Sequence, residues 1–248
     1  MLETALHALI DVYAKRRAVN VQDIQVSAPD AWQVDVSFHL PDGAFRLRNL
    51  GSEDAEALTA FSRGLGDTAR ELFCPYPWDD SAACTLAFQA AVAQSTGRID
   101  ASYLLEHDGE PFAHFFLWKA GGNPVSQQAG LEVPELGVAI ADAYQGRGFG
   151  SLAVRTLKAV ARQLDADAIE LTTATNNDAG WHTYQRAGFH DVGLLRVPLG
   201  VDVTAAELGD VTPTRFRVER QMVDILHQGK RHDILQYLAV KRGEDWEG

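Results

Sequence analysis

The segment 145–150, with the sequence Gln-Gly-Arg-Gly-Phe-Gly, most constrains how this chain can fold. Three glycines in five positions carry a high cost in backbone entropy and usually mark close approach by another group. The apolar run 136–140 before it predicts a strand, and the pattern from Ser151 to about Leu164 predicts a helix. A strand, a glycine-rich turn and a helix start indicate an anion site, because the first helical N–H groups have no partner within the helix. Arg147 adds a guanidinium for phosphate oxygens.

Three kinds of phosphate-binding turn compete for this segment. The P-loop pattern requires Gly-Lys-Ser/Thr after the glycines, and the segment has none. The dinucleotide fingerprint fits residues 148–153, but residues 141–145 separate it from its strand, and Glu170 opens the next strand instead of ending it. The acyl-CoA pattern Gln/Arg-x-x-Gly-x-Gly matches 145–150 without a gap. A glycine-rich turn with no ligand stays open as the simplest alternative.

A second segment, 176–189, ends in Tyr-x-x-x-Gly-Phe, where the tyrosine is Tyr184, and Asn177 stands seven residues before it. With both segments in this order, the chain resembles the GNAT superfamily of N-acetyltransferases over about residues 45–223. The resemblance implies that the turn binds the pyrophosphate of CoA. It also implies that Asn177 contacts the cofactor arm and that Tyr184 is the general acid.

The resemblance extends to the rest of the site. The implied cofactor-binding residues are Val138, Ala139, Ile140, Gln145, Gly146, Arg147, Gly148, Phe149, Gly150, Ser151 and Asn177. The family stabilises the oxyanion with a backbone N–H on the strand before the turn, which here suggests Val138 or Ile140.

The general base is less well defined than the acid. An amine with a pKa of about 10 must lose a proton before it can attack a thioester, so some group has to accept that proton. Glu135 is the expected base, because several family members carry a glutamate just before this strand. Other members use a glutamate on the following strand, where this chain has Thr172. Glu170 on the same strand face, or a chain of water molecules, is the alternative.

Composition narrows the classes of partner. Acidic residues outnumber basic ones by 34 to 22, for a net charge of −12. Such a charge disfavours nucleic acid and anionic membranes as partners and mildly favours cationic acceptors. The two cysteines, Cys74 and Cys84, have neither metal-ligand nor disulfide-framework spacing. No stretch approaches eighteen apolar residues and the start lacks a basic leader, so we expect a cytoplasmic protein without a metal.

Hydrophobic periodicity predicts an α/β (α+β) fold with a mixed central sheet flanked by helices. Helices are expected at 3–17, 53–63, 81–95, 151–164, 178–186 and 233–242, and strands at 32–40, 45–50, 101–106, 112–119, 136–140, 168–174, 192–197 and 215–223. We divide the chain into an N-terminal extension packed on the core (1–43), a GNAT domain (44–223) and a C-terminal helical tail (224–248).

Several features remain ambiguous in the sequence. Ser52 is a candidate cap for the helix 53–63. The segment 65–80 is expected to be irregular, and its aromatic residues suit either a substrate wall or a hydrophobic plug. His114 interrupts an apolar strand and is more consistent with a core histidine than with a proton relay. The terminal helix needs a partner surface, in this chain or in the second subunit of a homodimer.

The sequence thus predicts an acetyl-CoA-dependent N-acetyltransferase that moves an acetyl group directly to an amine, without a covalent enzyme intermediate. A CoA-binding sensor or structural domain on the same fold is the alternative, and a nicotinamide-dependent oxidoreductase is a third reading. The sequence does not identify the acceptor, although acidic residues in the loop 199–213 favour a cationic one.

Overall fold

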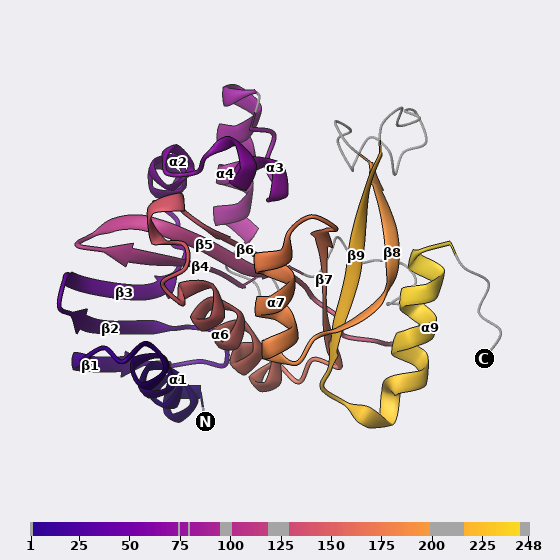
Figure 1. Ribbon diagram of the computed structural model, residues 1–248, viewed down its shortest axis with the longest axis horizontal. Coiled ribbons are helices and arrows are strands. Elements are labelled where there is room, and N and C mark those ends of the chain that lie inside the picture. The colour runs from indigo at the N-terminus through magenta and orange to yellow at the C-terminus, as the bar shows by residue number, and fades with distance from the viewer. Residues whose placement is uncertain are drawn as a thin grey trace.

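A nine-stranded sheet runs through the protein in the order β1-β2-β3-β4-β5-β6-β7-β9-β8 (Figure 1). The computed structural model describes residues 2–73, 75–78, 80–94, 101–118, 129–198 and 216–243. The strands are β1 (Gln22–Ser27), β2 (Asp35–Leu40), β3 (Gly43–Asn49), β4 (Ala101–His107), β5 (Glu110–Trp118), β6 (Glu135–Ile140), β7 (Ala168–Ala174), β8 (His190–Pro198) and β9 (Phe216–Ile225). Neighbouring strands are antiparallel except β6 and β7, which run parallel.

Helices cover both faces of this sheet. The helices are α1 (Leu2–Arg17), α2 (Ala55–Arg63), α3 (Asp67–Leu72), α4 (Ser81–Gln94), α6 (Phe149–Gln163), α7 (Asp178–Ala187) and α9 (Arg231–Lys241), with short 3-10 turns at Asp142–Tyr144 and Gln228–Lys230. Helices α1, α6 and α7 pack on one face in the largest core cluster (Figure 1). Helices α2 and α4 cover the other face over β4 to β6, and α9 covers that same face over β7 and β9. The expected mixed sheet with flanking helices is confirmed.

Alternation along the strands explains this division. On β5, Phe115 belongs to the cluster with α1, α6 and α7, whereas the next residue, Phe116, belongs to the cluster with α2 and α4. Successive strand side chains point to opposite faces, so a strand with apolar residues at both positions is buried on both sides.

The expected elements are present, with differences at their ends. Helix α2 begins at Ala55 with Asp54 at the N-cap, so the cap predicted at Ser52 is wrong. Asp54 is held there because its carboxylate accepts the Gly51 N–H and pairs with the Arg48 guanidinium. Helix α6 begins at Phe149, before the expected start at Ser151, since Gly148 takes a left-handed conformation at the N-cap.

Two elements were missed by the periodicity. The short helix α3 lies inside the segment expected to be irregular, and the edge strand β1 was not predicted. Strand β1 has a mostly exposed burial pattern, so it carries little of the apolar alternation that marks a strand. Cys74, the loop 199–213 and the last predicted strand's first residue lie outside the described residues.

The apolar face of the terminal helix α9 finds its partner within this chain. Ile234, Tyr237 and Leu238 pack with Ala168 of β7 and Val223 of β9. The sequence left open whether a second subunit would be needed, and the sheet itself covers these side chains. Among the described residues, no helix is both long and apolar enough to cross a membrane.

Candidate active site

Strands β6 and β7 part beyond their first residue pair. Within these two fully described strands the parallel register joins Glu135 to Glu170 alone. On its other edge β6 pairs with β5 along its whole length, and the next residue, Ala141, donates its N–H to Phe112 O of that strand. Because backbone groups alternate between the two edges, Val138 and Ile140 direct their N–H and C=O groups toward β7. The β6 edge of the opening is therefore lined by the backbone N–H groups of Val138 and Ile140, which have no partner in β7. The N–H and C=O groups of Ala139 point toward β5 instead.

The glycine-rich turn closes one end of this opening. Gly146 and Gly148 have φ angles of 71° and 91°, which side chains other than glycine rarely adopt. A Cβ placed on Gly146 or Gly150 would meet nothing within 4 Å, so the turn is open on that side. At Gly148 the stem of Arg17 lies 3.1 Å from the same position, so α1 covers that side. The turn offers a bare backbone surface at the N-terminus of α6, where N–H groups and the helix dipole favour an anion.

Two polar side chains of the turn hold the turn itself. Gln145 Nε2 donates to Ile140 O at 3.2 Å and to Asp142 Oδ1 at 3.1 Å, which ties the turn to the end of β6. Arg147 pairs with Asp42 at 2.5 Å, and its guanidinium lies over the Tyr144 and Phe149 rings at 5.3 and 5.4 Å. The sequence predicted that the Arg147 guanidinium binds phosphate. In the structure this guanidinium pairs with the Asp42 carboxylate and lies over the Tyr144 and Phe149 rings.

The two residues after the turn differ in exposure. The Phe149 side chain is fully buried and stacks on Tyr13 of α1 at a centroid distance of 5.4 Å. It anchors the start of α6 in the core, so only its backbone is available to a ligand. Ser151 is partly exposed, and its hydroxyl lies 3.4 Å from Arg155 Nε.

Asn177 caps helix α7. Its Oδ1 accepts the Gly180 N–H at 3.0 Å, and its Nδ2 donates to Thr173 Oγ1 at 3.1 Å. Both ends of the amide are therefore occupied by the protein, which gives Asn177 a structural role at the end of β7.

Tyr184 lies on the buried face of α7, 9% exposed, with its ring edge-on to Phe189. Its hydroxyl has no hydrogen-bond partner among the described residues. Burial, with a further contribution from the Glu219 carboxylate, raises the pKa of Tyr184 to about 12. The phenol is thus protonated at neutral pH.

Glu135 and Glu170 stand side by side at the closed end of the opening. Lys241, from α9, lies 3.0 Å from Glu170 Oε1 and 3.8 Å from Glu135 Oε2. Glu170 is fully enclosed: it also accepts from the Tyr237 hydroxyl at 2.6 Å and from Gln221 Nε2 at 3.2 Å. Glu135 remains 36% exposed by its side chain and has Lys241 as its cationic partner.

Burial and neighbouring charges together shift the pKa of the Glu135 carboxyl. The surrounding protein raises the pKa of the Glu135 carboxyl by removing water, Lys241 opposes this rise, and Glu170 and Glu219 add to it. The net direction is upward, as a base that works near neutral pH requires.

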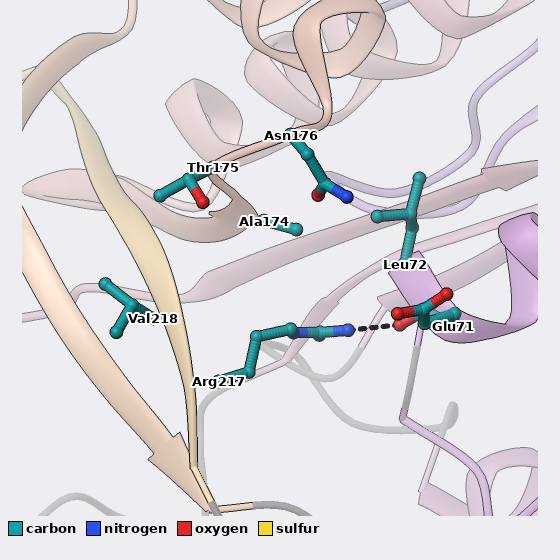
Figure 2. Close-up of a pocket in the computed structure, with 7 residues that line it drawn as sticks. All are labelled: Glu71, Leu72, Ala174, Thr175, Asn176, Arg217 and Val218. Carbon is teal, nitrogen blue, oxygen red and sulfur yellow. Dashed lines mark hydrogen bonds between the residues drawn. The ribbon is translucent and has the colours of Figure 1, made fainter.

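A cavity of about 330 Å³ opens between α3 and the ends of β7 and β9 (Figure 2). It is lined by Glu71, Leu72, Ala174, Thr175, Asn176, Arg217 and Val218. Arg217 reaches across it and donates to the Glu71 carbonyl oxygen (Figure 2), and its other nitrogens pair with Glu219. Glu219 is register partner to Ala174 and 3% exposed, so it faces the same side of the sheet as Glu170.

His114 belongs to the core. It is fully buried, its Nδ1 donates to Tyr103 O at 3.1 Å, and Nε2 therefore accepts from the Tyr76 hydroxyl at 2.8 Å. Burial lowers the pKa of His114 to about 4, so the ring is neutral. Cys84 is buried in the cluster with α2 and α4. Across the described ranges, no group of His, Cys, Asp and Glu side chains could hold a metal ion.

The structure thus places Glu135 and the turn at the two ends of the opening along β6, and it places Tyr184 on α7 in the core cluster that α6 shares. It adds Arg217, Glu219 and Lys241, which the motifs did not indicate. One signal could have pointed to two of them: the run Arg-Val-Glu-Arg-Gln-Met-Val puts charged side chains at alternate positions of a central strand. Lys241 follows Tyr237 by four residues, which places it on the buried face of α9.

A mixed sheet whose one parallel pair opens over a glycine-rich turn is the architecture of an acyl-CoA-binding acetyltransferase fold. The model of the acetyltransferase (GNAT) family matches residues 58–189, more than half of the 248 residues, and the chain belongs to that family. No curated protein sequence gave a match to the chain.

Solved structures share the fold at low sequence identity. A GNAT-family acetyltransferase from Streptococcus pneumoniae is 19% identical, with a TM-score of 0.54, and the match covers 73% of this chain and 99% of that one. YncA from Salmonella typhimurium, solved with its cofactor acetyl-CoA, is 15% identical with a TM-score of 0.55 and coverage of 74% and 95%. The ribosomal-protein-S5-alanine acetyltransferase from Vibrio fischeri is 12% identical with a TM-score of 0.56 and coverage of 77% and 97%.

Proposed function

We propose that this protein transfers an acetyl group from acetyl-CoA directly to the amine of an acceptor. The observation that carries the proposal is the opening between β6 and β7, with free backbone donors on one edge, the bare turn at one end and Glu135 at the other. Family membership and a neighbour solved with acetyl-CoA support the same chemistry.

The turn fits the pyrophosphate of CoA. Gly146 and Gly150 leave room where side chains would stand, and the first N–H groups of α6 are available to phosphate oxygens. Acetyl-CoA supplies an activated acyl group as a thioester. The backbone N–H of Val138 or Ile140 is the donor for its carbonyl oxygen, because both point into the opening. Arg147 stabilises the turn through Asp42, and Phe149 and Asn177 fix the two helices that flank the site.

Glu135 accepts the proton of the attacking amine. Its side chain is 36% exposed while its neighbour Glu170 is enclosed by three partners, so the two carboxylates differ in availability. The raised pKa of Glu135 brings its proton affinity closer to that of an amine at neutral pH, which helps the transfer.

Tyr184 donates a proton to the leaving thiolate. Its pKa of about 12 keeps the phenol protonated, and a thiolate of intrinsic pKa about 8.5 is a better leaving group when a donor is in place. Glu135 on β6 is thus the proposed general base, and Tyr184 on α7 is the proposed general acid.

The cavity between α3, β7 and β9 is the place for the acceptor. It lies on the sheet face that carries Glu135, Glu170 and Glu219, and these carboxylates favour an acceptor that arrives as a cation. The neighbour from Vibrio fischeri is named for an alanine of a ribosomal protein, and the fold alone transfers no such acceptor to this chain.

A CoA-binding domain without turnover is the second candidate. The protonated phenol of Tyr184 and the raised pKa of the Glu135 carboxyl support the enzyme. A nicotinamide-dependent reaction loses its main support, because Glu170, the residue expected at the ribose, is bound by Tyr237, Gln221 and Lys241.

A binding experiment comes first. We expect acetyl-CoA and CoA to raise the melting temperature of the full chain and NAD to leave it unchanged. A ligand at about a hundred times its Kd stabilises by about 2.7 kcal/mol, which is readily measured. Absence of a shift with both CoA ligands would contradict the proposal.

Turnover is tested next with a panel of amines and a free-thiol assay. Tyr184→Phe should lower kcat by about 10²–10⁴-fold while the Kd of CoA stays at the wild-type value. A variant that binds CoA and keeps the wild-type rate would remove Tyr184 from the mechanism. If the wild type binds CoA and acetylates no amine, the non-catalytic candidate takes its place.

A further inference from the structure

The buried carboxylate of Glu170 is bound by three side chains that come from β9 and α9. Glu170 is 1% exposed. The Tyr237 hydroxyl donates to its Oε1 at 2.6 Å, Lys241 Nζ lies 3.0 Å from the same oxygen, and Gln221 Nε2 donates to Oε2 at 3.2 Å. The matched family region ends at residue 189, so all three donors lie beyond it. Three donors hold this buried carboxylate in one position.

Helix α9 is itself fixed on the sheet, which gives Lys241 a defined position. Lys241 follows Tyr237 by four residues and therefore lies on the same face of the helix. Leu238 is fully buried in the core cluster beneath α9. The residue after Lys241, Arg242, donates to Gln221 Oε1 at 2.7 Å. The ammonium of Lys241 is thus held between β6 and β7 by contacts on both sides of it along the helix.

Glu170 and Glu135 share this ammonium unequally. The Lys241 nitrogen lies 3.0 Å from Glu170 Oε1, which is a hydrogen-bond distance, and 3.8 Å from Glu135 Oε2, which is not. The Glu135 side chain is 36% exposed, so water screens its attraction to the ammonium more than it screens that of the enclosed Glu170. Glu170 therefore retains the ammonium on its own side.

Three other charged side chains of β9 and α9 lie on this side of the sheet, and each has a partner. Glu219 pairs with Arg217, and Arg242 donates to the side-chain amide of β9. The register partner of Glu135 on β5 is Trp118, which carries no charge. Among the residues that the structure describes, the cation recorded against the Glu135 carboxylate is the ammonium of α9.

We propose that Glu170 is a positioning residue: it holds the Lys241 ammonium on its own side and so leaves the Glu135 carboxylate able to take a proton from the acceptor amine. The inference rests on the proposed function, in which Glu135 is the base. A cation in direct contact with Glu135 would stabilise its ionised form and weaken it as a base. The charge of Glu170 acts in the same direction, because a neighbouring anion favours the protonated form of Glu135.

The first test is a titration of the Glu135 carboxyl in the ligand-free full chain, followed by NMR of isotope-labelled glutamate carboxyls. The Glu135 signal is the one that is absent from Glu135→Gln. Glu170→Gln releases Lys241 toward Glu135, so the titration midpoint should move down by about one pH unit. Glu170→Asp keeps the charge and should stay closer to the wild-type midpoint. Lys241→Met should move the midpoint in the opposite direction, to higher pH.

The pH–rate profile of acetyl transfer separates a positioning residue from the base itself. Glu170→Gln should keep a decline in rate at low pH, displaced to lower pH. Its plateau rate should fall by less than about tenfold, because a weaker base still accepts the proton. Loss of the base would instead lower the rate by about 10²–10⁴-fold.

Glu106→Gln is the matched control. Glu106 is another buried strand glutamate, 7% exposed, and it pairs with one cation, Arg48. It lies on β4, which β5 separates from β6. This variant should leave the midpoint of Glu135 at the wild-type pH. Urea unfolding of each variant verifies that the fold is intact.

Three outcomes overturn the inference in distinguishable ways. An unmoved or raised midpoint in Glu170→Gln would show that Glu170 does not keep Lys241 from Glu135. A fall in rate of about 10²-fold or more, with loss of the decline at low pH, would make Glu170 the base. Failure of the wild type to bind CoA would remove the proposed function and with it any role of Glu170 in catalysis, even if the NMR midpoints move as expected.

Discussion

Glu135 and Glu170 are register partners between the parallel strands β6 and β7, and Lys241 lies within 3.8 Å of both carboxylates. The pair stands where the two strands separate. Glu170 is enclosed and bound by three side chains, while Glu135 stays partly exposed. A single cation from the terminal helix thus compensates two neighbouring carboxylates of unequal availability.

Glu135→Gln removes the proposed base without changing its size. We expect kcat/KM to fall by about 10²–10⁴-fold, because the amine keeps its proton. In the wild type the rate should decline at low pH as Glu135 protonates, starting at a higher pH than for an ordinary carboxyl, since its pKa is raised. A pH–rate profile measures this limb. If Glu135→Gln shows the same decline in rate at low pH, another group causes that decline.

Lys241→Met tests the electrostatic role of α9. Lys241 lowers the pKa of Glu135, so its removal should raise that pKa and move the acidic limb of the pH–rate profile to higher pH. The rate at the alkaline plateau should stay near wild type, because the base is then ionised in both proteins. Lys230→Met, another lysine near α9 that pairs with Asp167, is the comparison and should leave the limb in place. If the acidic part of the pH–rate profile stays at the wild-type pH in Lys241→Met, Lys241 does not set the pKa of the catalytic base.

Asn177→Ala separates a structural role from a cofactor contact. Loss of the α7 cap should lower the free energy of unfolding by about 1 kcal/mol, measured by urea denaturation. Asn177→Asp retains a capping oxygen and should recover most of that loss. The Kd of CoA should change little in Asn177→Asp. A large rise in Kd at unchanged stability would instead indicate a direct contact with the cofactor.

Two glycines of the turn should respond to alanine with opposite signs. Gly148→Ala forces a side chain into a left-handed conformation against the Arg17 stem and should cost about 1–2 kcal/mol of stability. Gly150→Ala lies inside α6 over open space and should raise stability by up to about 1 kcal/mol. Urea unfolding of the two variants without ligand provides the measurement. Equal effects would show that the turn is not held as described.

Asp167→Asn should lose stability in a pH-dependent way. Burial opposes ionisation of Asp167, but Lys230, the Glu132 N–H and His227 outweigh it and lower its pKa. Because the folded pKa lies below the unfolded value of about 4, the stabilisation is present above pH 4 and is lost as the pH falls through the folded pKa. The variant should be less stable by about 1–3 kcal/mol at pH 7, and the difference should shrink in acid. Urea unfolding at several pH values tests this, and a constant difference would contradict it.

The sequence by itself determined the family, the order of most strands and helices, and the turn. These follow from local rules: glycines at Gly146 and Gly148 permit φ angles that other residues avoid, and alternating apolar residues mark strands such as β5. The exact ends of α2 and α6 were not predictable, because distant partners such as Arg48 and Tyr13 fix them. Strand β1 escaped prediction because an exposed edge strand needs little apolar alternation.

Only the tertiary structure decided how the side chains of the site are used. Arg147 and Asn177 belong to the motifs, yet Asp42 and the α7 backbone occupy them. Lys241 lies far from every motif, yet α9 brings it to Glu135 and Glu170. A motif records which residues are close in sequence, whereas hydrogen bonding and charge depend on which residues the sheet and its covering helices place a few ångströms apart. That arrangement is set by strand register and core packing, which act across the whole chain.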